Sequence, residues 1–449
     1  MKKSLKTRSS SGLFAACLFL LILSAAGVQA RAGDVYTLEQ SIQEALENSR
    51  SLKAVQEKTE EARHVKDQAK ASFLPKLSTS YGYTHLSEVT RSTAIPLGGG
   101  LEIPAYDQNT QDNYQWKVTV TQPLFTGFAL TSAHELARLG VDLARIEVDL
   151  AELDLTLGVK EAYFDILRAE KGRKVAEKAV ESLQSNADVA RSFYKVGMIP
   201  VNDLLKAEVE LANAKQDLVK SQNGVALTRA AFNTLLARPV NRPLEVEDIL
   251  VYRQETASYQ DYQQRALQHR PEVKALDVNL LQADQQIRLA KSAFYPEAAL
   301  NYDYIKEGDD PGVSGSAFHD GNHWQVTAGL TWTFFEWGKT RSAVREKQSV
   351  RKQLIDTRAA LEDQVRLELQ QAILDLEVAD QNIPTTEKAV EQAEENLRVS
   401  EQRYRAQVTT MTEVLDAQTL LTRARTNYYN ALYDHNLAKA RLRRALGEG

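Results

Sequence analysis

The residues best suited to chemistry in this chain are seven histidines and many carboxylates. The histidines are scattered, and the closest pair, His319 and His323, lies in a stretch rich in glycine and aspartate. Such a pair can bind a metal, but the composition around it favours a solvated loop. The sequence has no nucleophile elbow, no HExxH motif and no CxxC motif. We therefore expect no enzyme, no metal and no cofactor.

Three of the carboxylates recur every seven residues in a proline-free stretch, 129–196. Seven residues make about two helical turns, so these side chains share one face of a helix. Two apolar stripes flank this polar strip. The carboxylates are Glu147, Asp154 and Glu161; one stripe is Leu136, Leu139, Leu143, Ile146, Leu150, Leu153 and Leu157, and the other is Ala137, Val141, Ala144, Val148, Ala151 and Leu155.

A helix with an apolar flank on each side of a polar strip needs a neighbour on both sides and water in front and behind. The stripes lie about 150° apart on a wheel of 3.5 residues per turn, which is the interior angle of a ring of about twelve helices. We predict a hollow coiled-coil barrel in which Glu147, Asp154 and Glu161 face the lumen. A broad amphipathic helix in a solid bundle is the alternative, but it does not explain the polar strip.

Further helices are expected from the same periodicity. The second long helix should cover 339–405, with a kink or break at Pro384. Shorter helices are expected at 38–74, 202–237, 260–295 and 412–446. From their lengths we expect 202–237 and 260–295 to accompany the first long helix end to end. By the same argument 412–446 and 38–74 should accompany the second.

Four stretches alternate between apolar and polar residues: 77–85, 114–125, 298–305 and 324–335. This alternation is typical of strands with one apolar face, and about 9–11 residues cross a bilayer as a tilted strand. Four strands cannot close a barrel, and lipid does not tolerate open sheet edges, so three chains should share a transmembrane β-barrel of about twelve strands. An ordinary soluble sheet is the alternative. The loops between the strands, 86–113 and 306–321, look like long exposed turns.

The prolines indicate where helix and strand meet. Pro75, Pro123 and Pro296 are placed at helix–strand joints, because proline fixes its own torsion and disfavours helix in the residue before it. The predicted fold class is α+β, mostly α.

The chain repeats itself: residues 70–83 return as 291–304, and 194–207 return as 404–417. A unit of about 210 residues is too long for a solenoid repeat and indicates an internal duplication. The first structural repeat is predicted to be 31–237, with strands 77–85 and 114–125 and long helices 129–196 and 202–237. An equatorial connector, 238–258, follows. The second repeat is 259–449, with strands 298–305 and 324–335 and long helices 339–405 and 412–446.

The first thirty residues have the pattern of a signal peptide. Lys2, Lys3, Lys6 and Arg8 precede an apolar run, and Val28-Gln29-Ala30 fits a cleavage site. The formal net charge of the whole chain is −5, and loss of those four cations makes it more negative. Binding to nucleic acid therefore has no electrostatic support.

The order and duplication of these features resemble the TolC-like family of Gram-negative outer-membrane efflux and secretion channels. The residues that carry the resemblance span the mature chain. They are Leu38 to Asn48, Arg270-Pro271-Glu272, the joints Phe73-Leu74-Pro75 and Phe294-Tyr295-Pro296, the segments Tyr194 to Ala207 and Tyr404 to Ala417, and Ala445-Leu446-Gly447.

The resemblance implies a homotrimer with its barrel in the lipid of the outer membrane and its helices in the periplasm. It implies a passive exit duct of a tripartite efflux or type I secretion system. A periplasmic adaptor protein and an inner-membrane pump of RND or ABC type would open the periplasmic tip. The transported substrate and the identity of the pump cannot be inferred from this sequence.

The resemblance also assigns residues. Tyr194, Gly197, Asp203, Tyr404, Gln407 and Glu413 would lie at the periplasmic tips, and Asp416 with Glu413 at the pore constriction. Gln407 replaces a family glycine, and Thr409 also departs from the pattern. The contacts that hold the tip closed are therefore expected to differ from those of the family. Asp416 can alternatively be a solvated charge near a helix start. A trimeric coiled-coil structural or adhesive surface protein is the remaining alternative function.

Overall fold

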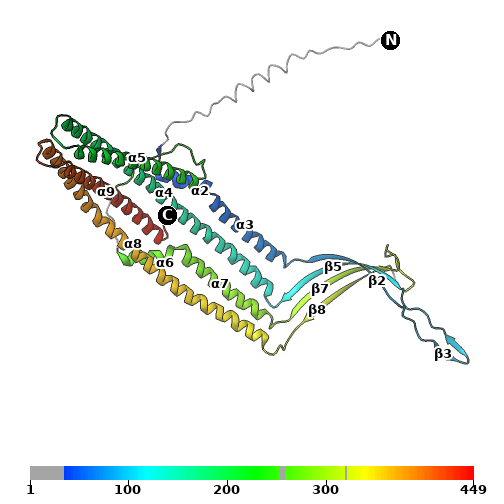
Figure 1. Cartoon of the computed structure of the whole chain (residues 1–449). Coiled ribbons are helices and arrows are strands. Elements are labelled where there is room, and N and C mark those ends of the chain that lie inside the picture. Colours follow the sequence, from blue (N-terminus) through cyan, green and yellow to red (C-terminus); the bar gives the residue numbers. More distant parts are fainter. Residues whose placement is uncertain (1–34, 253–257, 319–320) are drawn as a thin grey trace, which may run out of the picture.

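A computed structural model describes residues 35–252, 258–318 and 321–449, which form a long helical rod with a sheet at one end (Figure 1). The predicted signal peptide, 1–30, lies outside the described residues, and so does His319. None of the described helices carries an apolar stretch long enough to cross a lipid bilayer.

The described helices form two series whose members have equal lengths of 11, 22, 67 and 35 residues. The first series is α2 (Leu38–Asn48), α3 (Arg50–Ala71), α4 (Ala129–Lys195) and α5 (Val201–Leu235). The second is α6 (Tyr259–His269), α7 (Pro271–Ser292), α8 (Lys339–Arg405) and α9 (Met411–Ala445). A helix of 67 residues is about 100 Å long.

Two of the four shorter predicted helices, 38–74 and 260–295, are each divided into two. Ser49 separates α2 from α3 and accepts a hydrogen bond from the amide of Leu52, so it caps α3. Arg270 separates α6 from α7, which has Pro271 in its first turn. Of the kink or break predicted at Pro384, the break does not occur, because α8 is continuous through this residue. Ala379 and Ile383, just before the proline, are buried, and this packing holds the helix together although one backbone hydrogen bond is lost.

The main sheet has the order β2-β5-β7-β8 and is antiparallel throughout. Its strands are β2 (Lys76–His85), β5 (Asp112–Thr126), β7 (Glu297–Gly308) and β8 (Asn322–Thr331). Val118 pairs with Tyr304 and Val120 with Tyr302, so the apolar residues of neighbouring strands share a face. β8 ends before the predicted residue 335.

The loop after β2 is more ordered than the sequence suggested. It contains a small hairpin of β3 (Ile95–Gly98) and β4 (Leu101–Ile103), which projects beyond the main sheet (Figure 1). Gly98, Gly99 and Gly100 all have positive φ angles and make its turn.

The long helix α4 has neighbours on both sides, as the two apolar stripes predicted. It contacts α3 and α5 on one side and α7 and α9 on the other, and α8 forms the far edge (Figure 1). The predicted end-to-end pairing of the shorter helices is wrong. The end of α5 meets α2, where Arg238 forms an ion pair with Glu44. The end of α9 meets the start of α7, where Gly447 lies against the backbone of Arg270.

The connector segment packs against the middle of α4, where Leu244 and Leu250 share a core with Tyr163. Within the connector, β6 (Glu245–Val246) pairs in parallel with β1 (Val35–Tyr36). The Tyr163 hydroxyl of α4 lies 2.8 Å from the carbonyl oxygen of Tyr36 and 2.9 Å from that of Glu247. These contacts fix both segments to the middle of the rod.

An ion cluster around the buried Arg270 ties four helices together where α9 meets α7. Arg270 is only 3% exposed and lies 2.9 Å from Glu272 and 2.7 Å from Glu368 of α8. Arg444 of α9 lies 2.7 Å from Glu272 and 2.9 Å from Asp154 of α4. Burial raises the pKa of both glutamates, but hydrogen bonds and charge from Arg270 outweigh it and hold each pKa below its ordinary value.

We expect Arg270→Met to destabilise the protein by about 3 kcal/mol, because it leaves two carboxylates without their buried partner. The carboxylates have lowered pKa values in the folded state, so their stabilisation is present above the unfolded-state pKa of about 4.3 and is lost as the pH falls through the folded value. The variant should therefore lose less stability than the wild type on acidification. Thermal unfolding followed by circular dichroism at neutral and acidic pH measures both effects.

The matched control is Arg398→Met, which removes an exposed pair with Glu395 at 2.6 Å. It should change stability by less than about 1 kcal/mol. Equal effects of the two substitutions would contradict a structural role for the cluster.

Candidate functional site: the hairpin tips and the polar strip

Helices α4 and α5 form one long helical hairpin, and α8 and α9 form the other. The turns at the tips of these two hairpins have the same backbone conformation. In the first turn the amide of Gly197 donates to the carbonyl of Tyr194, and the amide of Met198 donates to that of Phe193. In the second turn Gln407 donates to Tyr404, and Val408 donates to Arg403. The φ angles of Gly197 and Gln407 are 75° and 61°. Each helix therefore ends in a left-handed residue, and only the first turn has the glycine suited to it.

We expect Gln407→Gly to stabilise the second turn by about 1 kcal/mol, because it removes a side chain from the left-handed region. Gly197→Ala should destabilise the first turn by a similar amount, and through the backbone alone, since no atom lies within 4 Å of the added Cβ. Amide hydrogen exchange over residues 193–200 and 403–410 measures both changes. No change in either turn would show that the strain is absent.

The two tyrosines that the repeat makes equivalent are placed differently. Tyr404 is only 5% exposed and packs against the ring of Phe193, with centroids 5.7 Å apart. Its hydroxyl has no hydrogen-bond partner among the described residues. Burial, reinforced by the charge of Asp203, raises its pKa. Tyr194 instead exposes its ring at the first tip. Tyr404 therefore joins the two hairpins, and Lys206 adds a hydrogen bond of 3.1 Å to Thr412.

The two carboxylates assigned to a pore constriction are also unlike each other. Glu413 lies 2.9 Å from Arg403 and accepts a hydrogen bond from the Thr409 hydroxyl, so it is fixed within its own turn. Asp416 is exposed and has no ion pair among the described residues. Only Asp416 therefore presents an uncompensated negative charge.

The three carboxylates of the polar strip remain accessible and each has a cationic neighbour. Glu147 lies 3.9 Å from Lys58 of α3, Asp154 lies 2.9 Å from Arg444, and Glu161 lies 3.0 Å from Arg441. Sequence reasoning missed the two arginines. The two arginines are three residues apart, so they lie on one face of α9. This spacing can be seen in the sequence, but it predicts the ion pairs only if α9 is known to pack beside α4.

The prolines are not all at joints. Pro75 and Pro296 directly precede β2 and β7, as predicted. Pro123 instead lies inside β5, where the register with β7 shifts between Pro123 and Phe125. The joint from strand to helix is at Gly127 and Phe128.

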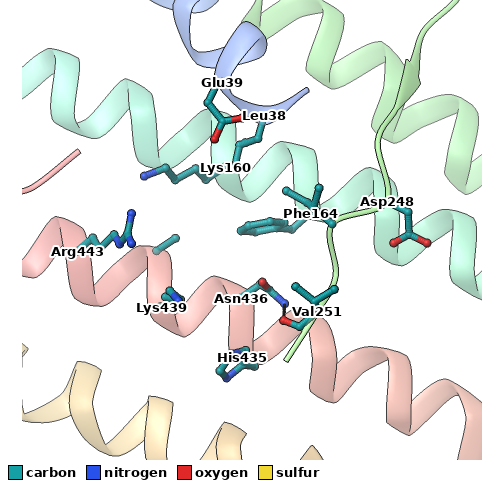
Figure 2. Close-up of a pocket in the computed structure, with 12 residues that line it drawn as sticks. Leu38, Glu39, Lys160, Phe164, Asp248, Val251, His435, Asn436, Lys439 and Arg443 are labelled. Atoms are coloured by element: carbon teal, nitrogen blue, oxygen red, sulfur yellow. Dashed lines mark hydrogen bonds between the residues drawn. The ribbon is translucent and has the colours of Figure 1, made fainter. Parts of the chain in front are cut away.

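A cavity of about 470 Å³ lies where the connector crosses α4 and α9 (Figure 2). Lys160, Lys439 and Arg443 line one part, and Phe164 and Val251 line another. Burial and the charge of Arg443 lower the pKa of Lys160. Among the described residues that line it there is no serine, threonine or cysteine.

The fold is that of solved outer-membrane channels. VceC from Vibrio cholerae superposes with a TM-score of 0.74 at 19% identity, covering 92% of this chain and 96% of VceC. MtrE from Neisseria gonorrhoeae gives 0.72 at 21% identity, covering 92% and 89%.

The sequence comparisons extend this similarity to a family. The profile of the outer membrane efflux protein family matches residues 41–238 and 263–448, and the chain belongs to this family. The outer membrane protein TolC of Vibrio cholerae is 23% identical over 441 residues, which cover 95% of this chain and 94% of TolC. The pyoverdine export outer membrane protein OpmQ of Pseudomonas putida is 21% identical over 423 residues, covering 92% and 86%.

Proposed function

We propose that the chain is one subunit of a homotrimeric outer-membrane channel. It would serve as the passive exit duct of a tripartite efflux or type I secretion system. The observation that carries this proposal is that the sheet and the helical layer of a single chain are each open at both edges. Each edge has the chemistry of a surface that another copy covers.

The sheet edges are β2 and β8, which pair on one side only. All residues of both strands are exposed in the single chain. Open edges are not tolerated in lipid. Pairing of β8 in one copy with β2 in the next closes the sheet, and three copies give a barrel of about twelve strands.

The helical edges carry exposed apolar stripes. On α5 the stripe is Leu205, Val209, Val219 and Leu227, and on α8 it is Leu367, Leu374 and Val378. One end of each stripe lies at a matching height: Leu227 is 26 residues from Val201, and Val378 is 27 residues from Arg405. Both lie about 40 Å from the tips. From there the α5 stripe continues toward the tip and the α8 stripe continues away from it. Docking of α5, continued by α2 and α3, against α8 of the next copy would bury both stripes.

The equal helix lengths in the two series support an internal duplication. A trimer of duplicated chains would place about twelve helices around one bore. We propose that Glu147, Asp154 and Glu161 face this bore, and that the connector forms a belt outside it. The helical part would lie in the periplasm and the sheet in the outer membrane.

The tips would be the contact for a periplasmic adaptor protein, which links the duct to an inner-membrane pump of RND or ABC type. The exposed Tyr194 and the turn residues Gly197 and Gln407 would meet the adaptor. Tyr404 would hold the hairpins together beneath them, Asp203 would lie at the tip in the first turn of α5, and Glu413 would hold the second turn. Asp416 would form the constriction. No catalytic step or cofactor is needed for a conduit.

Purified protein inserted in a planar bilayer tests this function. We expect heat-resistant trimers in detergent and ion conductance that increases when Arg403→Ala removes the brace on Glu413. Trimers that never conduct, even with this substitution, would instead favour the coiled-coil surface fibre.

A further inference from the structure

The turn from β5 into α4 holds an aromatic ring outward at a cost in backbone strain. Gly127 and Phe128 have φ angles of 59° and 72°, and Phe128 is 55% exposed. The turn into α8 has the same arrangement. The φ angle of Trp337 is 51° and its side chain is 91% exposed, and Gly338 follows with a φ angle of 85°. Aromatic residues rarely adopt the left-handed region, and such strain is concentrated at functional positions.

The turn into α4 is rigid. A Cβ atom at Gly127 would lie 2.4 Å from the carbonyl oxygen of Ser292, so the backbone of α7 leaves room only for glycine. Phe128 is therefore held against Phe125 and Tyr295. The three rings meet edge to face, with centroids 5.5, 5.6 and 6.5 Å apart.

This aromatic trio (Phe125, Phe128 and Tyr295) continues the apolar face of the sheet. The shift in register after Pro123 pairs Phe125 with Ala298. Ala298 lies two residues from Leu300 and therefore on the same face of β7. Without the bulge, Phe125 would point to the opposite, polar face.

A cavity of about 470 Å³ lies directly beside the trio, between the start of α4 and the end of α7. Arg288 and Lys291 line it, and among the described residues neither has a carboxylate within ion-pair distance. The one carboxylate in the lining, Glu135, is occupied by Arg138 at 2.6 and 2.8 Å. The cavity therefore combines two cations that form no ion pair among the described residues with an exposed aromatic surface, although the charge of Arg288 adds to that of Arg138 in lowering the pKa of Glu135.

We propose that this cavity binds the headgroup of an anionic phospholipid, with Arg288 and Lys291 at the phosphate and the trio against the glycerol and upper acyl chains. The inference rests on the proposed function, because a sheet that spans the membrane places its strand-to-helix turns at the membrane surface. Aromatic rings and basic side chains are the residues that anchor proteins at that depth.

Native mass spectrometry of the detergent-purified trimer tests the proposal, with phosphatidylglycerol and phosphatidylcholine as competing probes. The wild type should prefer phosphatidylglycerol. Arg288→Gln with Lys291→Gln should weaken its binding about tenfold or more. Arg288→Lys with Lys291→Arg should retain most of the binding. Lys174→Gln with Lys220→Gln removes the same charge far from the sheet and should change nothing.

Equal binding of phosphatidylglycerol by the wild type and the glutamine variant would overturn the proposal. Equal competition by inorganic phosphate would also overturn it, since the site would then recognise phosphate and not lipid. If the double variant does not assemble, Lys291→Gln alone gives the comparison. Conductance separates this inference from the function: a wild type that conducts without preferring phosphatidylglycerol refutes only the lipid site, whereas a wild type that never conducts refutes the channel.

Discussion

Leu367→Asp is expected to abolish the heat-resistant trimer. Leu367 is 69% exposed in the single chain and lies in the apolar stripe of α8, opposite the buried seam that contains Leu369. Burying an unpaired carboxylate there costs on the order of 3 kcal/mol at each of the interfaces that a closed ring repeats. Electrophoresis of unheated samples and light scattering in detergent measure the result.

The control for this substitution is Leu281→Asp on α7. Leu281 is also exposed, at 52%, but α7 already has α4 and α8 of its own chain as neighbours. The trimer should survive this change. If both substitutions leave the trimer intact, the stripes on α5 and α8 are not the interface.

Asp416→Asn is expected to lower the preference of the open channel for cations over anions by about threefold or more. A ring of carboxylates at a narrow point attracts cations and repels anions, and among the described residues of the single chain no cation forms an ion pair with Asp416. Reversal potentials in a salt gradient across a planar bilayer measure the ratio of permeabilities.

Glu413→Gln removes the same charge at the same tip and is the informative comparison. Because Arg403 and Thr409 already hold Glu413, this substitution should mainly raise the probability of opening, with a smaller change in selectivity. A shift in selectivity with Glu413→Gln but none with Asp416→Asn would place the constriction at Glu413.

The long elements were predictable because their periodicity is unbroken. The heptads between Leu136 and Leu157 and the alternation from Tyr114 to Val120 each come from burial of one face, which acts locally at every turn or pair of residues. For the same reason, the two apolar stripes predicted that α4 has neighbouring helices on both sides. The hairpin of β3 and β4 could not, because its strands are very short and Pro96 obscures the alternation.

The end-to-end order of the shorter helices was predicted wrongly because length alone cannot decide it. The choice depends on contacts between distant residues, such as Arg238 with Glu44 and Gly447 with Arg270. At the tips, the repeat made Tyr194 and Tyr404 equivalent, yet only Tyr404 is buried. Sequence similarity between two turns fixes their backbone, but each side chain is placed by the neighbouring hairpin.

Thiol labelling of the assembled trimer tests the hollow barrel most directly. Cysteines substituted for Glu147 and Asp154 should react rapidly with a small polar reagent that enters through the barrel, because in the proposed trimer a column of water would run along the strip. Cysteines substituted for Leu143 and Leu150, on the flanks between helices, should be protected. Uniform labelling of the four positions, or protection of the first pair, would show that the helices enclose no bore.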